Sequence, residues 1–355
     1  MSESSEAKAA PDVEWVPSSD DRFTMRGLWW YEENERCFSR LPHRAKDVVR
    51  EPVWQLAQCP AGARLCFRSD TTSIRVRCML PHATPMAHMP LTGQSGFALY
   101  CGGPGRVLPR ALAFPQLKET EFERVLFEGV SPALREYTLY LPLYEGVTSL
   151  EVGLDKGAAV EAPSAPAVEA PVVFYGTSIT QGGCAHTAGA DYESILGRML
   201  DLDTINLGFS GNGQGEPEVA ELISEIDASL YALDYVANVD LATLEATLPR
   251  FVEILRAKHP ETPIALMSRV VFTACTYSPE AREKQEAQRD IIIHFYSRAR
   301  QAGDANIHFM DGNALIPYGA QLAYSDQGVH PTSVGFQMMA EGLAPQIAQI
   351  LLADG

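Results

Sequence analysis

The sequence predicts an antiparallel β-sandwich followed by an α/β domain, in which about five parallel strands form a doubly wound sheet. Three observations lead to this expectation. The first part of the chain contains short stretches in which apolar and polar residues alternate. A segment rich in Ala, Pro and Glu interrupts this pattern at residues 157–171. Beyond it, short apolar runs alternate with apolar stripes at helical spacing.

The composition is that of a folded, acidic protein. The chain has 355 residues, of which 46% are hydrophobic and 21% charged, and its formal net charge is −17. This charge repels phosphate backbones and anionic membrane surfaces, which argues against nucleic-acid and membrane partners. No apolar run reaches the ~20 residues that span a bilayer. The polar, acidic N-terminus also differs from a signal peptide, so we expect a soluble cytoplasmic protein.

The expected boundaries divide the chain into four parts. They are a mobile tail (1–12), a β-sandwich domain (13–156), a linker (157–171) and an α/β domain (172–355). The seven cysteines form no Cys-x-x-Cys pair, which argues against a disulfide framework and against a zinc site.

Alternating residues predict the strands of the sandwich. Leu65 and Phe67 alternate with arginines, and the same pattern resumes at Ile74 beyond a polar turn at residues 69–72. This pattern favours a hairpin with one buried and one solvated face. A later loop, rich in Pro and Met, contains two histidines, His82 and His88. Because no third ligand accompanies them, we expect a surface loop there and not a metal site.

Short apolar runs mark the strands of the α/β domain. They are Val172–Tyr175, Thr204–Leu207, Leu230–Val236, Pro263–Met267 and Ile307–Met310. Apolar stripes at helical spacing lie between or after them, at residues 219–226, 244–255 and 339–351. Strands that alternate with helices in this way favour a parallel sheet.

The stretch that begins with the first of these strands is the centre of the functional interpretation. The strand ends at Gly176, where the backbone can bend sharply, and Ser178 follows beside Thr180. A serine on such a turn presents its hydroxyl at the C-terminal edge of the sheet, where open α/β folds bind ligands. The alternative is that Ser178 only caps the next helix.

Polar residues also follow other strands. Gly211 comes after the second strand, Asn238 after the third and His330 after the fifth. All these loops open at the same edge of a parallel sheet. Each residue alone has a structural interpretation, as a helix start, a turn or a helix cap. Together they supply a nucleophile, a base and donors for an oxyanion, the groups that acyl transfer requires.

These blocks resemble those of the SGNH (GDSL-type) hydrolases, a family named for its Ser, Gly, Asn and His. The resemblance lies in the runs YGTSITQGG (175–183), NLGFSGNG (206–213), Ala237-Asn238 and GVHPT (328–332). It extends to a two-domain branch with an N-terminal, jelly-roll-like β-sandwich. The resemblance implies a three-layer α/β/α, flavodoxin-like catalytic domain.

By this resemblance, Ser178 is the nucleophile and His330 the base. The N–H groups of Ser178 and Gly211 and the side chain of Asn238 form the oxyanion hole. Two departures from the family pattern stand out. The first domain reads Gly-Phe-Ala-Leu-Tyr at residues 96–100, where the branch has Gly-x-Asp-Leu-Tyr. The histidine block lacks the usual Asp three residues before His330.

Asp326, four residues before His330, is the only carboxylate in that block. A bulge at Gly328 can bring Asp326 within reach of the histidine as the third catalytic member. Alternatively, a backbone carbonyl orients His330 and the site is a Ser–His dyad. Arg269 follows the fourth strand and can hold a polar or anionic part of the substrate, or it forms a structural ion pair.

The resemblance implies a serine esterase that hydrolyses short, acetyl-like esters of a sugar or small molecule through an acyl-enzyme on Ser178. Two alternatives stay open. One is an acyltransferase that moves the acyl group to a small-molecule hydroxyl, and the other is a catalytically silent binding protein with the same fold. No metal or organic cofactor is implied, and the sequence does not indicate an oligomeric state.

Overall fold

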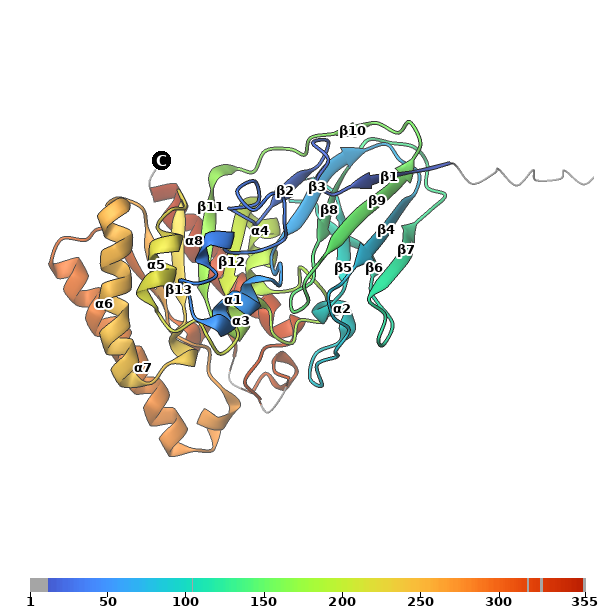
Figure 1. Ribbon diagram of the computed structural model, residues 1–355. Helices are drawn as coiled ribbons and strands as arrows, with labels where there is room; N and C mark the ends of the chain where they lie inside the picture. The colour runs from blue at the N-terminus through green and yellow to red at the C-terminus, as the bar shows by residue number, and fades with distance from the viewer. Residues whose placement is uncertain (1–11, 104, 318, 326–327, 354–355) are drawn as a thin grey trace, which may run out of the picture.

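Two antiparallel sheets and one parallel sheet form the framework of the molecule (Figure 1). The computed structural model describes residues 12–103, 105–317, 319–325 and 328–353. The antiparallel sheets belong to the N-terminal part of the chain and the parallel sheet to the C-terminal part. The predicted fold class, a β-sandwich followed by an α/β domain, is therefore confirmed.

The N-terminal sandwich consists of a four-stranded and a six-stranded sheet. The first has the order β1 (Val13–Pro17), β9 (Ser149–Asp155), β4 (Ile74–Met79), β7 (Glu121–Phe127). The second has the order β10 (Val160–Glu161), β3 (Arg64–Ser69), β8 (Arg135–Tyr140), β5 (Phe97–Cys101), β6 (Leu108–Ala113), and β2 (Thr24–Arg26) also pairs with β3. Apolar residues that alternate along both sheets meet in one core, which includes Phe67, Val76 and Phe97.

The predicted hairpin between β3 and β4 is wrong. β3 pairs with β2, β8 and β10, whereas β4 pairs with β7 and β9, so residues 70–73 connect two different sheets. Alternation showed which side chains are buried but not which strands pair. The outer face of β3 is only partly solvated: Arg64 is 5% exposed and forms an ion pair with Asp203 of the α/β part, whereas the Arg68 side chain is 39% exposed.

The parallel sheet has the strand order 2-1-3-4-5 of a flavodoxin-like fold. The strands are, in spatial order, β12 (Leu202–Gly208), β11 (Val168–Gly176), β13 (Leu230–Asp234), β14 (Ile264–Met267) and β15 (Ile307–Met310). β11 is buried from Pro171 to Gly176 and begins within the expected linker, at Val168. All of its pairs with β12 and β13 are parallel.

Helices cover both faces of this sheet, which gives three layers. One face carries α5 (Pro217–Ile223), α6 (Leu241–Lys258) and α7 (Pro279–Gln301), against alternate strand residues such as Val173 and Tyr175. The other carries α3 (Ser178–Gln181), α4 (Tyr192–Leu200) and α8 (Ser333–Ala353), against Val172 and Phe174. The sequence of α7 shows no clear apolar stripe, because Ile292 is the one apolar residue that this helix buries.

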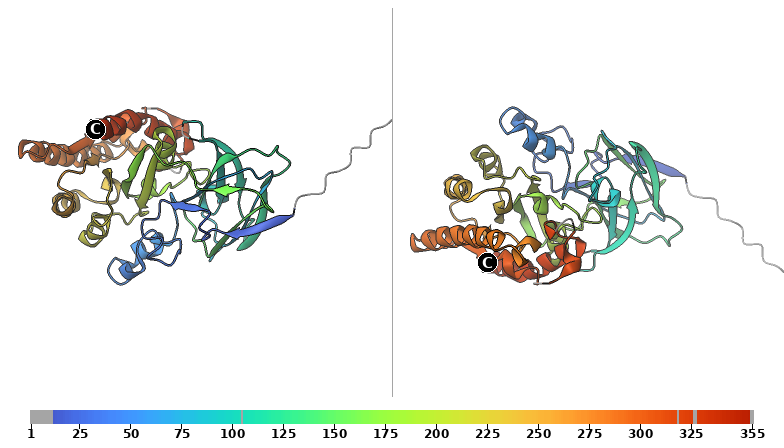
Figure 2. Two further views of the ribbon diagram at one scale, coloured as in Figure 1. Left: turned by 90° about the horizontal axis from the view of Figure 1, so that it is seen from above. Right: turned by 90° about the horizontal axis from the view of Figure 1, so that it is seen from below.

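Part of the N-terminal segment packs on the α/β domain and not in the sandwich. It contains α1 (Glu51–Ala57) and a 3₁₀ turn at His43–Ala45, which lie beside the parallel sheet and apart from the sandwich in both views of Figure 2. Buried residues of this segment join the core formed by α5 and α6, and they are Trp30, Leu41, Ala45, Val49, Val53 and Ala57. The short helix α2 (Leu91–Gln94) lies in the later Pro- and Met-rich region. No helix in the described ranges is long and apolar enough to cross a membrane.

Candidate active site

Ser178 stands on a tight turn at the C-terminal end of β11. Thr177 caps α3: its hydroxyl accepts a hydrogen bond from the Ile179 N–H at 3.2 Å. The Thr180 hydroxyl accepts one from the Thr177 N–H at 3.1 Å, which completes a capping box. Thr177 therefore caps the helix, and Ser178, as its first residue, is left partly accessible while its neighbours are buried.

Gly176 is required by close packing and not by an unusual φ angle. A Cβ at this position would lie 2.1 Å from the Thr180 hydroxyl oxygen and 2.6 Å from the Asp234 carbonyl oxygen. In the sheet, Gly176 pairs with Gly208 on one side and with Asp234 on the other. The loops that leave β11, β12 and β13 therefore begin at the same level of the sheet.

His330 lies next to this turn, although it is 152 residues away in the chain. Its Nε2 atom is 2.7 Å from the Ser178 hydroxyl oxygen, which is hydrogen-bonding distance. A β-bridge between Tyr324 and Pro331 closes the histidine loop. The Ser325 N–H also donates to the His330 carbonyl at 2.8 Å. The spacing fits a base that removes the proton of a serine nucleophile.

The loop that contains Gly211 contacts both Asn238 and α3: the Ser210 N–H donates to the Gln181 side chain at 3.0 Å. Gly211 has a φ of +68°, in the left-handed region that favours glycine. Asn238, at the end of a 3₁₀ turn (Val236–Asn238), donates from Nδ2 to the Phe209 carbonyl at 3.3 Å. This bond holds the amide against the Gly211 loop and leaves its second N–H for another acceptor. Ser178, as the first helical residue, has an N–H without an intrahelical acceptor.

A buried acidic group supports the turn from beneath. The Asp234 carboxylate accepts hydrogen bonds from the Thr180 hydroxyl at 3.2 Å and the Tyr192 hydroxyl at 3.0 Å. Burial raises the pKa of Asp234 to about 7. Because Thr180 is also a member of the capping box, the protonation of Asp234 is linked to the serine turn.

Arg40, from the N-terminal segment, holds the strand that leads to Gly211. It is 1% exposed, and its guanidinium donates to the carbonyls of Gly208 at 2.6 Å and Cys59 at 2.7 Å. Burial lowers the pKa of Arg40 to about 10, because the described hydrogen bonds of its guanidinium are to carbonyl and amide oxygens and not to a carboxylate. The guanidinium also lies over the Phe209 ring, with Cζ 4.9 Å from the ring centroid.

Two further residues of the N-terminal part border the site. The Tyr144 hydroxyl donates to the Ser178 carbonyl at 3.2 Å. The exposed His88 ring lies with its centroid 6.0 Å from that of His330. The His88 loop is held by Gln94, which is 2% exposed and bonds to Met86 and Thr84. Neither Tyr144 nor Arg40 was expected near Ser178, and His88 was expected only on a surface loop. No local sequence pattern links these three residues to Ser178.

Asp326 and Arg269 are the two remaining residues expected in the site, and the structure describes only Arg269. Asp326 lies outside the described residues. Arg269 follows β14 directly and is 9% exposed, and burial lowers its pKa. Its Cζ lies 4.5 Å from the Phe272 ring centroid, and its Nε has no hydrogen-bond partner. Among the described residues it forms no ion pair, and no hydrogen bond joins it to Ser178 or His330.

The described ranges contain no group of three or more His, Cys, Asp or Glu side chains that could hold a metal ion. The groups gathered around Ser178 are instead a hydroxyl, an imidazole, an amide and backbone N–H donors. Such a set can attack a carbonyl carbon and stabilise the resulting oxyanion.

Two family profiles together match nearly the whole chain. The profile of the GDSL-like lipase/acylhydrolase family matches residues 169–348. A second profile, which describes the N-terminus of SGNH-hydrolase-type esterases and is called GxDLY, matches residues 13–160. The second match holds although Ala98 replaces the aspartate of the GxDLY motif. No curated protein matches the chain.

Several solved structures share both parts of the fold. A protein described as a GDSL-like lipase from Bacteroides ovatus has a TM-score of 0.88 and 28% identity, with 96% of this chain and 98% of that chain covered. The salicylyl-acyltransferase SsfX3 from a tetracycline biosynthetic pathway has a TM-score of 0.78 and 24% identity, with coverage of 95% and 97%. A family two carbohydrate esterase from Cellvibrio japonicus has a TM-score of 0.63 and 15% identity, with coverage of 96% and 98%. The last two likenesses concern the fold alone.

Proposed function

Because the chain belongs to the GDSL-like lipase/acylhydrolase family, we propose that it is a serine esterase that acts through an acyl-enzyme on Ser178. The observation that carries this proposal is the 2.7 Å separation of Ser178 Oγ and His330 Nε2. His330 takes the hydroxyl proton as Oγ attacks the ester carbonyl carbon. The same proton then passes to the departing alcohol oxygen, and the acyl group stays on Ser178.

The negative charge of the tetrahedral intermediate rests on three donors. They are the N–H groups of Ser178 and Gly211 and the Nδ2 group of Asn238. A water molecule, activated by His330, then attacks the acyl carbon and releases the acid. Asp326 remains our proposed third member, which accepts from the other ring nitrogen of His330 and stabilises the imidazolium. A backbone carbonyl in its place makes the site a dyad.

The proposed substrate is a short, acetyl-like ester of a sugar or another small molecule. Fold neighbours include family two carbohydrate esterases, and one from Clostridium thermocellum was solved in complex with cellohexaose. This supports a sugar as the alcohol. Arg269, which is buried and forms no ion pair with any residue that the structure describes, stays a proposed contact for a polar or anionic substrate group.

A second candidate function is transfer of the acyl group to a small-molecule hydroxyl. One fold neighbour, of which the match covers 97%, is described as a salicylyl-acyltransferase. In this chain, His88 stands beside His330, where a leaving or accepting alcohol must exchange its proton. Hydrolysis and transfer use the same catalytic groups and differ in whether water reaches the acyl-enzyme.

The test combines a covalent probe with a substrate panel. We expect a fluorophosphonate to label Ser178 and Ser178→Ala to abolish labelling and turnover together. Acetyl, butyryl and octanoyl esters, each with and without sugar acceptors, then separate hydrolysis from transfer. Labelling of a different serine, with full activity in Ser178→Ala, would overturn the proposal.

A further inference from the structure

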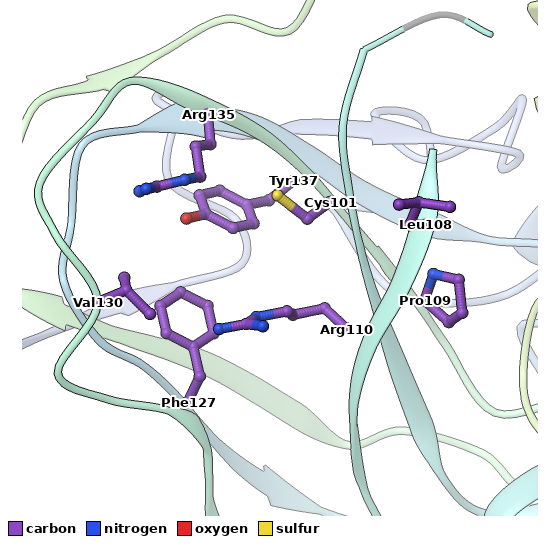
Figure 3. Close-up of a pocket in the computed structure, with 8 residues that line it drawn as sticks. All are labelled: Cys101, Leu108, Pro109, Arg110, Phe127, Val130, Arg135 and Tyr137. Carbon is purple, nitrogen blue, oxygen red and sulfur yellow. The ribbon is translucent and has the colours of Figure 1, made fainter. Parts of the chain in front are cut away.

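A cavity lies in the N-terminal sandwich and shares no residue with the candidate active site. Its volume is about 370 Å³. One wall comes from β7 of the first sheet and the others from β5, β6 and β8 of the second, so the cavity lies where the two sheets face each other. Figure 3 shows the side chains that line it, which are Cys101, Leu108, Pro109, Arg110, Phe127, Val130, Arg135 and Tyr137.

The cavity carries two positive charges and no carboxylate. Arg110 and Arg135 line it, and no Asp or Glu does. Four other arginines of the sandwich form ion pairs with glutamates, and they are Arg68, Arg75, Arg77 and Arg124. Within the described part of the chain, Arg110 and Arg135 form no ion pair. Arg135 donates to the carbonyls of Ser131 and Ala133, at 3.0 and 3.2 Å.

Two aromatic rings form part of the apolar lining of the cavity. Phe127 and Tyr137 stack with their centroids 5.8 Å apart and their planes at 25°. The Arg110 guanidinium lies over the Phe127 ring, with Cζ 5.1 Å from the centroid. In Figure 3 the Arg135 side chain lies beside the Tyr137 ring, and Arg110 extends toward Phe127. The cations are thus presented next to flat apolar surface.

The remaining polar groups of the cavity are neutral. Burial raises the pKa of the Tyr137 hydroxyl and of the Cys101 thiol, so both keep their protons at neutral pH. The hydroxyl can therefore donate a hydrogen bond, and the thiol does not offset the arginine charges.

We propose that this cavity is a binding site for a small carboxylate carried on a planar ring, such as an aromatic acid. Two guanidinium groups offer several N–H donors to one carboxylate. The stacked rings of Phe127 and Tyr137 provide apolar contact for the planar portion. The volume lies within the range of small-molecule sites, about 300–1,000 Å³. This site does not depend on the chemistry proposed for Ser178.

Benzoate and its neutral analogue benzamide provide the test, with the full chain titrated in low salt and followed by calorimetry or ligand-observed NMR. The variant Arg110→Gln/Arg135→Gln removes both cavity charges. The matched control, Arg75→Gln/Arg77→Gln, removes two arginine charges from the other sheet of the same domain. Far-UV circular dichroism and thermal melting establish that both variants are folded.

We expect benzoate to bind more tightly than benzamide by at least about tenfold, because bonds to a charged acceptor contribute most of the affinity. The cavity variant should lose at least about tenfold in benzoate affinity, and the control variant should keep it. Added salt should weaken the binding. Equal affinity for benzamide, unchanged binding in the cavity variant, or no benzoate binding below about 10 mM in the wild-type chain would each overturn the proposal.

Discussion

At the residue scale, Asn238 has the most direct link to the proposed chemistry. Its amide is anchored to the Phe209 carbonyl at 3.3 Å, so one N–H remains in a constant position beside Gly211. A donor of this kind acts on charge that develops only in the transition state. It should therefore affect the rate of acyl transfer more than substrate binding.

We expect Asn238→Ala to lower kcat by roughly 10²–10³ and to leave KM nearly unchanged. Steady-state kinetics with an acetyl ester measure both constants. Asn306→Ala is the matched control, because Asn306 also donates from its amide to a backbone carbonyl, that of Glu261 at 2.6 Å, but directly precedes β15 and so lies at the opposite edge of the sheet. If Asn238→Ala altered KM alone, the side chain would instead bind ground-state substrate.

His88 gives a different expectation, because it lies beside the base and not beside the oxyanion position. The imidazole is exposed and 6.0 Å, centroid to centroid, from His330. In the proposed mechanism His330 returns its proton to the leaving alcohol, and His88 then borders the alcohol side of the site. An imidazole there can exchange hydrogen bonds with hydroxyl groups of a sugar.

His88→Ala should lower kcat/KM for sugar esters by about tenfold, the loss of one or two hydrogen bonds, and leave the value for the matching methyl ester unchanged. His82→Ala, an exposed histidine in the same loop, should affect neither substrate. Comparison of the two esters separates an effect on the alcohol from an effect on the acyl group. An equal loss for both esters would mean that His88 only supports His330.

At the element scale, the turn between β11 and α3 rests on a buried acid. Asp234 ends β13, and its carboxylate bonds to Thr180 of the capping box and to Tyr192 of α4. Burial raises its pKa from an ordinary 3.8 to about 7. In the unfolded chain the group ionises near 3.8, whereas in the folded chain it holds its proton up to about 7.

The contribution of Asp234 to stability should therefore be greatest at low pH. Between pH 3.8 and about 7 the folded state binds more protons than the unfolded state, so stability falls as pH rises. The loss is on the order of 4 kcal/mol at most. Urea unfolding at several pH values should show a shallower fall for Asp234→Asn, whose amide cannot ionise. Identical slopes for the variant and the wild type would contradict the raised pKa.

At the scale of the whole molecule, the N-terminal part completes the catalytic domain. Arg40 binds the end of β12, and the Tyr144 hydroxyl donates to the Ser178 carbonyl. Six buried apolar residues between Trp30 and Ala57 belong to the core that α5 and α6 form on the parallel sheet. Removing them exposes a large apolar surface and leaves buried carbonyls without donors.

We therefore expect residues 157–355 alone not to form a stable, active domain. A protease site inserted after Ala162, which is exposed, gives the matched control. Cleavage there should leave both parts associated and active, because the contacts of Arg40 and of α1 are retained. Cooperative melting and ester turnover are the measurements. Normal activity of 157–355 expressed by itself would show that the N-terminal contacts are dispensable.

The fold class and the order of the polar residues at the strand ends can be predicted from the sequence alone. Short apolar runs, each followed by Ser178, Gly211, Asn238 or His330, are local patterns. In a parallel sheet all such ends share one edge, so the pattern alone predicts that these residues approach one another. The 2.7 Å separation of Ser178 and His330 agrees with this expectation.

The pairing of the strands, and the N-terminal residues that reach the site, could be read only from the three-dimensional structure. The alternation in β3 and β4 is the same whether they form a hairpin or lie in different sheets, so it could not reveal that residues 70–73 cross between sheets. Arg40 contacts Gly208 across 168 positions, and His88 contacts the loop of His330 from another domain. Contacts between such distant residues leave no periodicity in the sequence, because they depend on how two separately patterned parts pack together.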